Sequence, residues 1–189
     1  MQIKKELRRF YREKRKSIAD KEVKDKRICE CFLNSELYKN ARTLLCYAAL
    51  KDEINTDSII IRALKDGKKV ALPRCLDFNG NMDFYYIKSL SELTEGAFGI
   101  REPDIHICGK VKNFTDCVCL VPALAYDKNG YRLGYGKGFY DRFFKKFIII
   151  SVGLCYNETL SDGLPVEEHD EAVDYIATDH EIICLNRRI

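Results

Sequence analysis

The sequence predicts an α/β fold in which helices flank both faces of a doubly wound, mostly parallel β-sheet, giving three layers. Short apolar runs of strand length alternate along the chain with segments of helical period. The chain has 189 residues, 46% of them hydrophobic, and shows no internal repeat, linker or low-complexity tract. We therefore expect one domain over residues 1–189, with a ligand crevice beyond the C-terminal ends of the parallel strands.

Two helices are expected before the first strand. Apolar residues between Ile3 and Tyr11 recur at helical spacing, which predicts an N-terminal helix. The segment "SIAD" at 17–20 has the spacing of a capping box and predicts a second helix that runs toward Phe32. The apolar run "TLLCYAAL" at 43–50 then predicts a buried strand.

A helix and a second strand follow. Asn55 or Thr56 is placed to cap a helix that continues through Leu64, and Gly67 is placed to end it. The run "KKVALP" at 68–73 predicts the next strand.

Five further strands complete the expected sheet. "MDFYYI" at 82–87 predicts a peripheral strand, because polar residues interrupt it. "CVCLVP" at 117–122 and "FIIISVGLCY" at 147–156 are almost wholly apolar, which predicts central strands. "VDYIAT" at 173–178 and "EIICL" at 181–185 predict a final strand pair.

Composition argues against a membrane or secreted protein. No run approaches the ~18 apolar residues of a membrane helix, and "MQIKKELRRF" at the N-terminus lacks the apolar region of a secretory signal. We therefore expect a cytoplasmic protein without a membrane partner. The nine cysteines are an odd number and lack metal-knuckle spacing, so we expect reduced thiols. Cys117 and Cys119 should pack on one face of their strand.

Positive charge gathers at the N-terminus. Residues 1–27 contain twelve Lys and Arg against five Asp and Glu, although the net charge of the chain is only +3. Nucleic acid, a nucleotide phosphate or solvent could each face such a segment. A nucleic-acid-binding module would spread basic and aromatic residues over a broad face, whereas here they gather in one predicted helix pair. We therefore expect no nucleic-acid partner.

The stretch "YRLGYGKGFYDRF" at 131–143 has the features of a phosphate-binding loop. Glycines at alternate positions, then Lys137, then a predicted helix running to Phe147 combine free N–H groups, an ammonium and a helix N-terminus. The spacing matches neither a P-loop nor a dinucleotide fingerprint. A tight packing turn would explain the glycines, but not Arg132, Lys137 and Asp141 together.

The segment "VPALAYDKNGYRLGYGKGFYDRF" at 121–143 resembles the signature of the 5-formyltetrahydrofolate cyclo-ligase family. The resemblance extends along the chain in the same order, through "KKELR", "KDEINT", "ALPR", "FGIREP" and "LPVEEHDEAVDYIAT". It implies that ATP phosphorylates the formyl oxygen of 5-formyltetrahydrofolate to give an iminium phosphate. N10 then attacks the activated carbon, and 5,10-methenyltetrahydrofolate, ADP and phosphate result. Another ATP-dependent ligase or kinase on the same scaffold is the alternative.

The resemblance also implies where the ligands bind. Lys4 and Arg8, one helical turn apart, would reach the ATP phosphates together, although surface charge would also explain them. Arg74 follows a strand end and is a further candidate. The complete set expected to bind ATP is Lys4, Lys5, Arg8, Arg74, Arg132, Leu133, Gly134, Tyr135, Gly136, Lys137, Gly138, Phe139 and Tyr140.

Within this set the resemblance implies catalytic roles for Arg132, Lys137 and Tyr140. Family members commonly have Tyr where Phe139 stands, so no polar role is assigned to Phe139. Folate would contact Ala48, Glu53, Tyr135 and Tyr140.

The expected cofactors are ATP, as co-substrate, and Mg²⁺ held by Asp141 and Asp170, since magnesium prefers carboxylates and water. Taken alone, Asp141 would more often be a helix cap. The three histidines, His106, His169 and His180, have no metal-site spacing. We expect a monomer.

Overall fold

Seven strands form one sheet in a computed structural model that describes residues 2–77, 79–96 and 99–185. Five strands are parallel, and an antiparallel strand closes each edge. In spatial order they are β12 (Ile182–Cys184), β11 (Tyr175–Ala177), β9 (Ile150–Leu154), β6 (Cys117–Val121), β1 (Thr43–Leu45), β2 (Lys69–Cys75) and β3 (Met82–Ile87). The predicted strands are confirmed, with the peripheral one at an edge.

The order of the parallel strands creates a switch point between β1 and β6. The chain moves outward from β1 to β2 on one side, and from β6 through β9 to β11 on the other. Leu44 pairs with Val70 on one side and with Val118 on the other. Crevices for ligands lie at such reversals, beyond the carboxyl ends of the strands.

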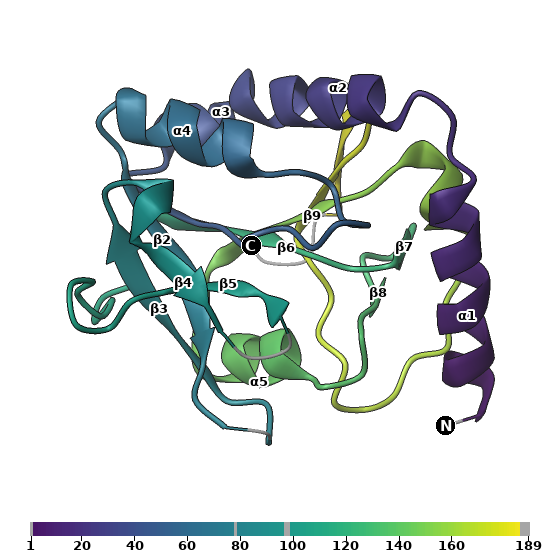
Figure 1. Cartoon of the computed structure of the whole chain (residues 1–189). Coiled ribbons are helices and arrows are strands. Elements are labelled where there is room, and N and C mark those ends of the chain that lie inside the picture. The colour runs from purple at the N-terminus through teal and green to yellow at the C-terminus, as the bar shows by residue number, and fades with distance from the viewer. Residues whose placement is uncertain (1, 78, 97–98, 186–189) are drawn as a thin grey trace.

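Helices cover both faces of the sheet, so the predicted three layers are confirmed (Figure 1). One face carries α2 (Lys21–Leu33), α3 (Glu36–Asn40) and α4 (Asp57–Lys65), and the opposite face carries α5 (Phe139–Lys146). The apolar core divides in the same way, because alternate residues of each strand face opposite layers. Cys117 and Cys119 share the α5 side. All nine cysteines lie in the described ranges and are free thiols.

Helix α1 (Gln2–Lys16) packs beside a small three-stranded sheet at one end of the molecule (Figure 1). That sheet contains β10 (Leu160–Ser161), β7 (Ala125–Asp127) and β8 (Arg132–Leu133). Tyr11 of α1 joins Leu124, Ala125 and Leu133 in a separate apolar cluster. A hairpin of β4 (Leu93–Glu95) and β5 (Arg101–Pro103), with two 3₁₀ turns, η1 (Leu90–Glu92) and η3 (Asn157–Thr159), completes the described elements.

Two local predictions are wrong. No capping box opens α2: Asp20 occupies the cap position in the left-handed region (φ 52°), and its side chain makes no capping hydrogen bond. The Ser17 hydroxyl instead donates to the carbonyl of Lys14 and closes α1. Strand β1 ends at Leu45, not at residue 50, because the next residues leave the sheet and line a cavity. Helix α3, capped by Ser35, was not predicted.

Gly67 ends α4 as expected, with φ 76° and its N–H donating to Leu64. No helix among the described residues has the length and apolar character to cross a membrane.

Candidate active site

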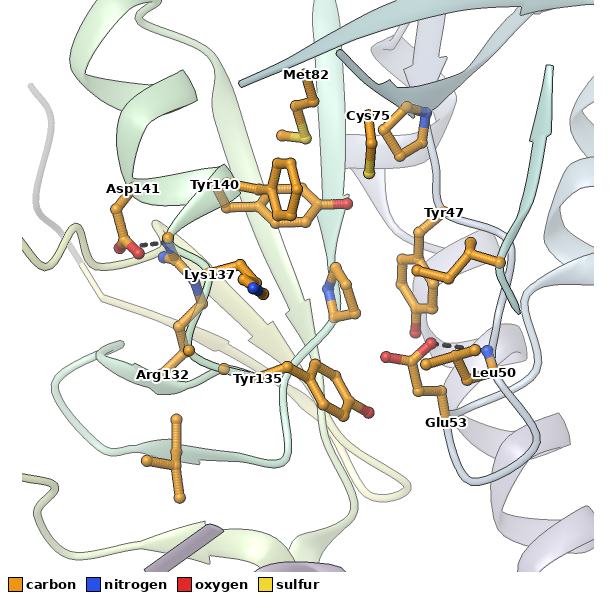
Figure 2. Close-up of a pocket in the computed structure, with 18 of the residues that line it drawn as sticks. Tyr47, Leu50, Glu53, Cys75, Met82, Arg132, Tyr135, Lys137, Tyr140 and Asp141 are labelled. Atoms are coloured by element: carbon orange, nitrogen blue, oxygen red, sulfur yellow. Dashed lines mark hydrogen bonds and ion pairs between the residues drawn. The ribbon is translucent and has the colours of Figure 1, made fainter. Parts of the chain in front are cut away.

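A cavity of about 560 Å³ opens at the switch point between β1 and β6 (Figure 2). Its walls are α1, the segment after β1, the ends of β2 and β3, the loop from β8 into α5, and residues 167–170. Segments distant in sequence therefore converge at one place, which is where ligands bind in open α/β sheets.

The glycine loop forms one end of the cavity. Gly136 (φ 95°) and Gly138 (φ 68°) are left-handed, and Gly138 caps the N-terminus of α5. The Arg8 Nε donates to the Gly134 carbonyl at 2.9 Å, and a Cβ at Gly136 would lie 3.2 Å from the Arg8 guanidinium. The cationic Arg8 side chain thus lies directly against the loop and leaves little room for a side chain at Gly136, as a close backbone approach to phosphate would require.

Arg132 and Asp141 form a largely buried ion pair within this loop, with Nη2 2.5 Å from Oδ1 (Figure 2). The other Arg132 terminal nitrogen donates to the Glu171 carbonyl at 2.5 Å, and the Glu171 N–H donates to the same Asp141 oxygen at 3.1 Å. Arg132 is therefore fixed by protein groups on two sides. It lines the cavity from this fixed position.

Asp170 is held by α1. Lys4 Nζ lies 2.6 Å from its Oδ2, which also accepts the Glu167 N–H at 2.8 Å. Burial acts to raise the pKa of Asp170, but the hydrogen bonds from Lys4 and Glu167 outweigh it, so the pKa is lowered. Glu167, His169 and Asp170 bring one potential metal-ligand atom each to within 4.8 Å of one another. The group does not include Asp141.

Glu53 lies at the opposite end of the cavity. The residue is 6% exposed, and its carboxylate accepts the Leu50 N–H at 2.8 Å. Burial raises its pKa, and the hydrogen bonds of Leu50 and Tyr135 oppose that rise. The Tyr140 hydroxyl is buried and has no hydrogen-bond partner in the described part of the chain, and burial raises its pKa. This end therefore presents a buried acid beside aromatic rings.

The structure gathers most of the predicted site residues. Lys4, Arg8, Ala48, Glu53, residues 132–141 and Asp170 all line the cavity. Two predicted residues, Lys5 and Arg74, do not line the cavity. Lys5 is on the exposed side of α1, and the Arg74 guanidinium instead donates to the Pro103 carbonyl at 2.8 Å.

Sequence reasoning missed several lining residues: Tyr47, Leu50, Pro73, Cys75, Met82, Ile100, Glu102, Pro122, Glu167 and His169. The available signal was the position of Pro73, Cys75, Met82 and Pro122 at or just past the ends of expected strands. His169, set aside for lack of spacing, lies beside the predicted metal ligand Asp170.

Comparisons with known proteins agree on one family. Residues 1–179 match the model of the 5-formyltetrahydrofolate cyclo-ligase family. The chain is 33% identical to 5-formyltetrahydrofolate cyclo-ligase of Saccharomyces cerevisiae over 162 residues, which cover 72% of this chain and 75% of the yeast protein. It is 30% identical to the Mus musculus enzyme of that name over 151 residues, covering 74% of each.

A solved structure extends the likeness to the whole fold. The NMR structure of Aquifex aeolicus 5,10-methenyltetrahydrofolate synthetase superimposes with a TM-score of 0.83 at 29% identity, covering 99% of this chain and 95% of that chain. With the family model matching nearly the whole length, the chain belongs to the 5-formyltetrahydrofolate cyclo-ligase family.

Proposed function

We propose that this protein closes 5-formyltetrahydrofolate to 5,10-methenyltetrahydrofolate with consumption of ATP. The observation that carries the proposal is one cavity with two chemically different ends. A glycine loop with cations from α1 forms one end, and a buried carboxylate among aromatic rings forms the other. Family membership selects this reaction over another ATP-dependent ligase or kinase.

ATP would bind at the glycine-loop end. Arg8 lies against Gly134 and Gly136, and Lys137 follows in the same loop. Backbone N–H groups at the start of α5 and these cations match a polyphosphate in charge and in hydrogen bonding.

Folate would bind at the Glu53 end. Its pterin ring carries N–H donors, and the Glu53 carboxylate is an acceptor enclosed by apolar and aromatic side chains. A charged acceptor in such a place selects for a ligand that donates, because an unpaired buried carboxylate is unfavourable.

Magnesium fits the carboxylates at the phosphate end. Arg132 and Glu171 hydrogen-bond Oδ1 of Asp141, and Lys4 and Glu167 hydrogen-bond Oδ2 of Asp170. The other oxygen of Asp170 lies 3.9 Å from the His169 Nε2. Oxygen ligands of this kind suit a hard divalent ion. When bound, the ion would neutralise charge on the transferred phosphoryl group.

In the proposed reaction the formyl oxygen attacks the γ-phosphorus, the bond to the bridging oxygen breaks, and ADP leaves. N10 then attacks the activated carbon and loses its proton, the carbon–oxygen bond breaks, and phosphate leaves as the ring closes. The protein contributes alignment of two ligands and compensation of developing charge. The cations Lys4, Arg8 and Lys137 would compensate the developing negative charge.

The test is to incubate the protein with 5-formyltetrahydrofolate, ATP and Mg²⁺ and to follow the absorbance of the methenyl product, with each component omitted in turn. ADP release without methenyl product would instead favour another ligase or kinase. No turnover, together with salt-dependent retention on an immobilised polyanion, would favour a nucleic-acid-binding module.

Three cations of α1 speak against that last alternative, because Lys4, Arg8 and Arg15 each hydrogen-bond groups of the protein. We further propose that the protein acts as a monomer in the cytoplasm.

A further inference from the structure

A second arginine holds the glycine loop, and it comes from the helix that follows the loop. Arg142 lies four residues after the cap residue Gly138, and its N–H donates to the Gly138 carbonyl at 3.1 Å. Its side chain turns back toward the helix N-terminus, as long side chains on helices do, and Nη2 donates to the Lys137 carbonyl. A Cβ at Gly138 would lie 3.1 Å from Nη1. The guanidinium therefore lies directly against residues 137–138.

Arg142 lies outside the cavity proposed to hold the two ligands. It lines a second cavity of about 380 Å³, between α5 and the turn that joins β2 to β3. Lys137 and Gly138 line the first cavity, as Arg8 does. Arg142 thus contacts the glycine loop from behind, whereas Arg8 contacts it within the ligand cavity. The role of Arg142 therefore lies in what it holds in place.

The other partner of Arg142 is the β2–β3 turn, which lies next to α5 (Figure 1). The Arg142 Nε donates to the Gly80 carbonyl at 3.1 Å. Gly80 has φ 90°, and a Cβ on it would overlap the guanidinium and would also meet the Lys137 carbonyl. The turn and the glycine loop therefore pack closely, and a residue without a side chain leaves room for Arg142 between them.

The turn provides a firm anchor for this contact. Asp77 Oδ1 accepts the N–H groups of Asn79 and Asn81 at 2.9 and 3.1 Å, and Oδ2 accepts the Asn81 side-chain amide at 2.8 Å. The Leu76 N–H donates to the Asn81 carbonyl at 2.9 Å. Hydrogen bonds of this kind fix the backbone of a turn, so the Gly80 carbonyl has a defined position. Arg142 therefore ties the glycine loop to a connection within the main sheet.

The hydrogen bond to the Lys137 carbonyl determines where the next N–H points. The C=O of Lys137 and the N–H of Gly138 belong to one trans peptide unit, so they point in opposite directions. Because Arg142 holds the carbonyl, the Gly138 N–H is directed away from Arg142. This N–H immediately precedes the first turn of α5, where backbone donors and the helix dipole favour an anion.

We propose that Arg142 is a positioning residue for the nucleotide end of the cavity, which clasps the glycine loop to the β2–β3 turn and thereby orients the Gly138 N–H as a donor to phosphate. That the phosphate belongs to ATP rests on the proposed function. The clasp of Arg142 with Lys137 and Gly80 does not.

The clasp is tested without a ligand, by NMR relaxation of the full chain labelled at the nitrogen of its eleven glycines. The Gly80 and Gly138 signals are assigned by their loss in Gly80→Ala and Gly138→Ala. In Arg142→Met their order parameters should fall below the value of about 0.85 for a rigid backbone, while that of Gly67 at the end of α4 stays unchanged. Arg142→Lys should restore part of the loss, because an ammonium can still donate to a carbonyl. Unchanged order at both glycines in folded Arg142→Met overturns the proposal.

Calorimetric titration then tests the effect on each ligand. In Arg142→Met the affinity for Mg-ATP should fall about tenfold, as expected for loss of hydrogen bonds from a charged group, while the affinity for 5-formyltetrahydrofolate stays within about twofold. Arg142→Lys should again restore part of the affinity for Mg-ATP.

Gly80→Ala is an independent variant, which also serves should Arg142→Met fail to fold. Its added methyl group displaces the guanidinium from a position outside the ligand cavity, so it should weaken Mg-ATP binding as Arg142→Met does. Gly67→Ala is the matched control, because it adds the same methyl group at φ 76° with nothing within 4 Å, and it should leave Mg-ATP binding unchanged. Combining Gly80→Ala with Arg142→Met should have little further effect, since both disrupt one clasp.

An unchanged affinity for Mg-ATP, equal losses of affinity for both ligands, or fully additive effects would show that Arg142 serves only the fold. If the parent binds Mg-ATP but forms no methenyl product, the proposed function fails, and the titrations still decide the role of Arg142.

Discussion

Gly136→Ala isolates the contribution of the glycine loop, and Gly134→Ala is its matched control. Gly136 has φ 95°, and an added Cβ would lie 3.2 Å from the Arg8 guanidinium. Gly134 lies two residues away with nothing within 4 Å of an added Cβ and without a positive φ. The two substitutions add the same methyl group to the same loop, so any difference between them reflects local geometry.

The expected magnitude follows from two effects. A left-handed conformation costs a non-glycine residue about 1–2 kcal/mol. If Arg8 moves away, its 2.9 Å hydrogen bond to the Gly134 carbonyl is lost, for about 0.5–1.5 kcal/mol more. If ATP binding requires the present loop conformation, the sum of about 1.5–3.5 kcal/mol corresponds to an affinity loss of roughly 10-fold to several hundred-fold.

Calorimetric titration of Mg-ATP into each variant measures this loss, with thermal unfolding as the control for folding. We expect Gly134→Ala to remain within about twofold of the parent, because its added methyl group meets open space. Equal ATP affinities for the two folded variants would refute the reasoning and remove the loop from the ATP site.

Three further predictions follow from the same cavity. Glu53→Gln should raise the melting temperature at pH 7, because the pKa of the buried Glu53 carboxyl is raised and the carboxyl is destabilising when charged. Melting curves at several pH values should show this gain shrinking as the pH falls toward about 4.3, the ordinary pKa of a glutamate. Tyr140→Phe should raise the free energy of unfolding by about 1–3 kcal/mol in urea titrations, since it removes a buried hydroxyl that has no hydrogen-bond partner within the described ranges. A decrease in the free energy of unfolding would mean that the hydroxyl is hydrogen-bonded. Asp141→Asn and Asp170→Asn should each raise the Mg²⁺ concentration required for half-maximal turnover, and an unchanged requirement in both would assign the carboxylates to the fold alone.

Elements dominated by local pattern were predictable from the sequence. β6 and β9 are almost wholly apolar because nearly all of their residues are buried in the central sheet, and Gly67 ends α4 because glycine adopts the left-handed turn without strain. The small strands β7, β8 and β10 have only two or three residues each and depend on pairing between distant segments, which periodicity cannot detect.

The site divides in a similar way. The loop at 132–141 was predictable because its glycines, cations and following helix are contiguous. Arg74 was placed by its position after a strand, but the hairpin that engages its guanidinium through Pro103 was not predicted. Arg15 looked like one more charge in a basic helix. Only the packing of α1 against the Ala123 carbonyl buries it.

The contacts of α1 have a consequence for the order of folding during synthesis. Its hydrogen bonds from Arg15, Arg8 and Lys4 reach partners 108, 126 and 166 residues further along the chain. The helix leaves the ribosome before all three of these partners, and contacts between such distant segments form slowly. We therefore expect the N-terminal helix to dock after the central sheet has formed, so that the cavity becomes complete only once residues near Asp170 have emerged.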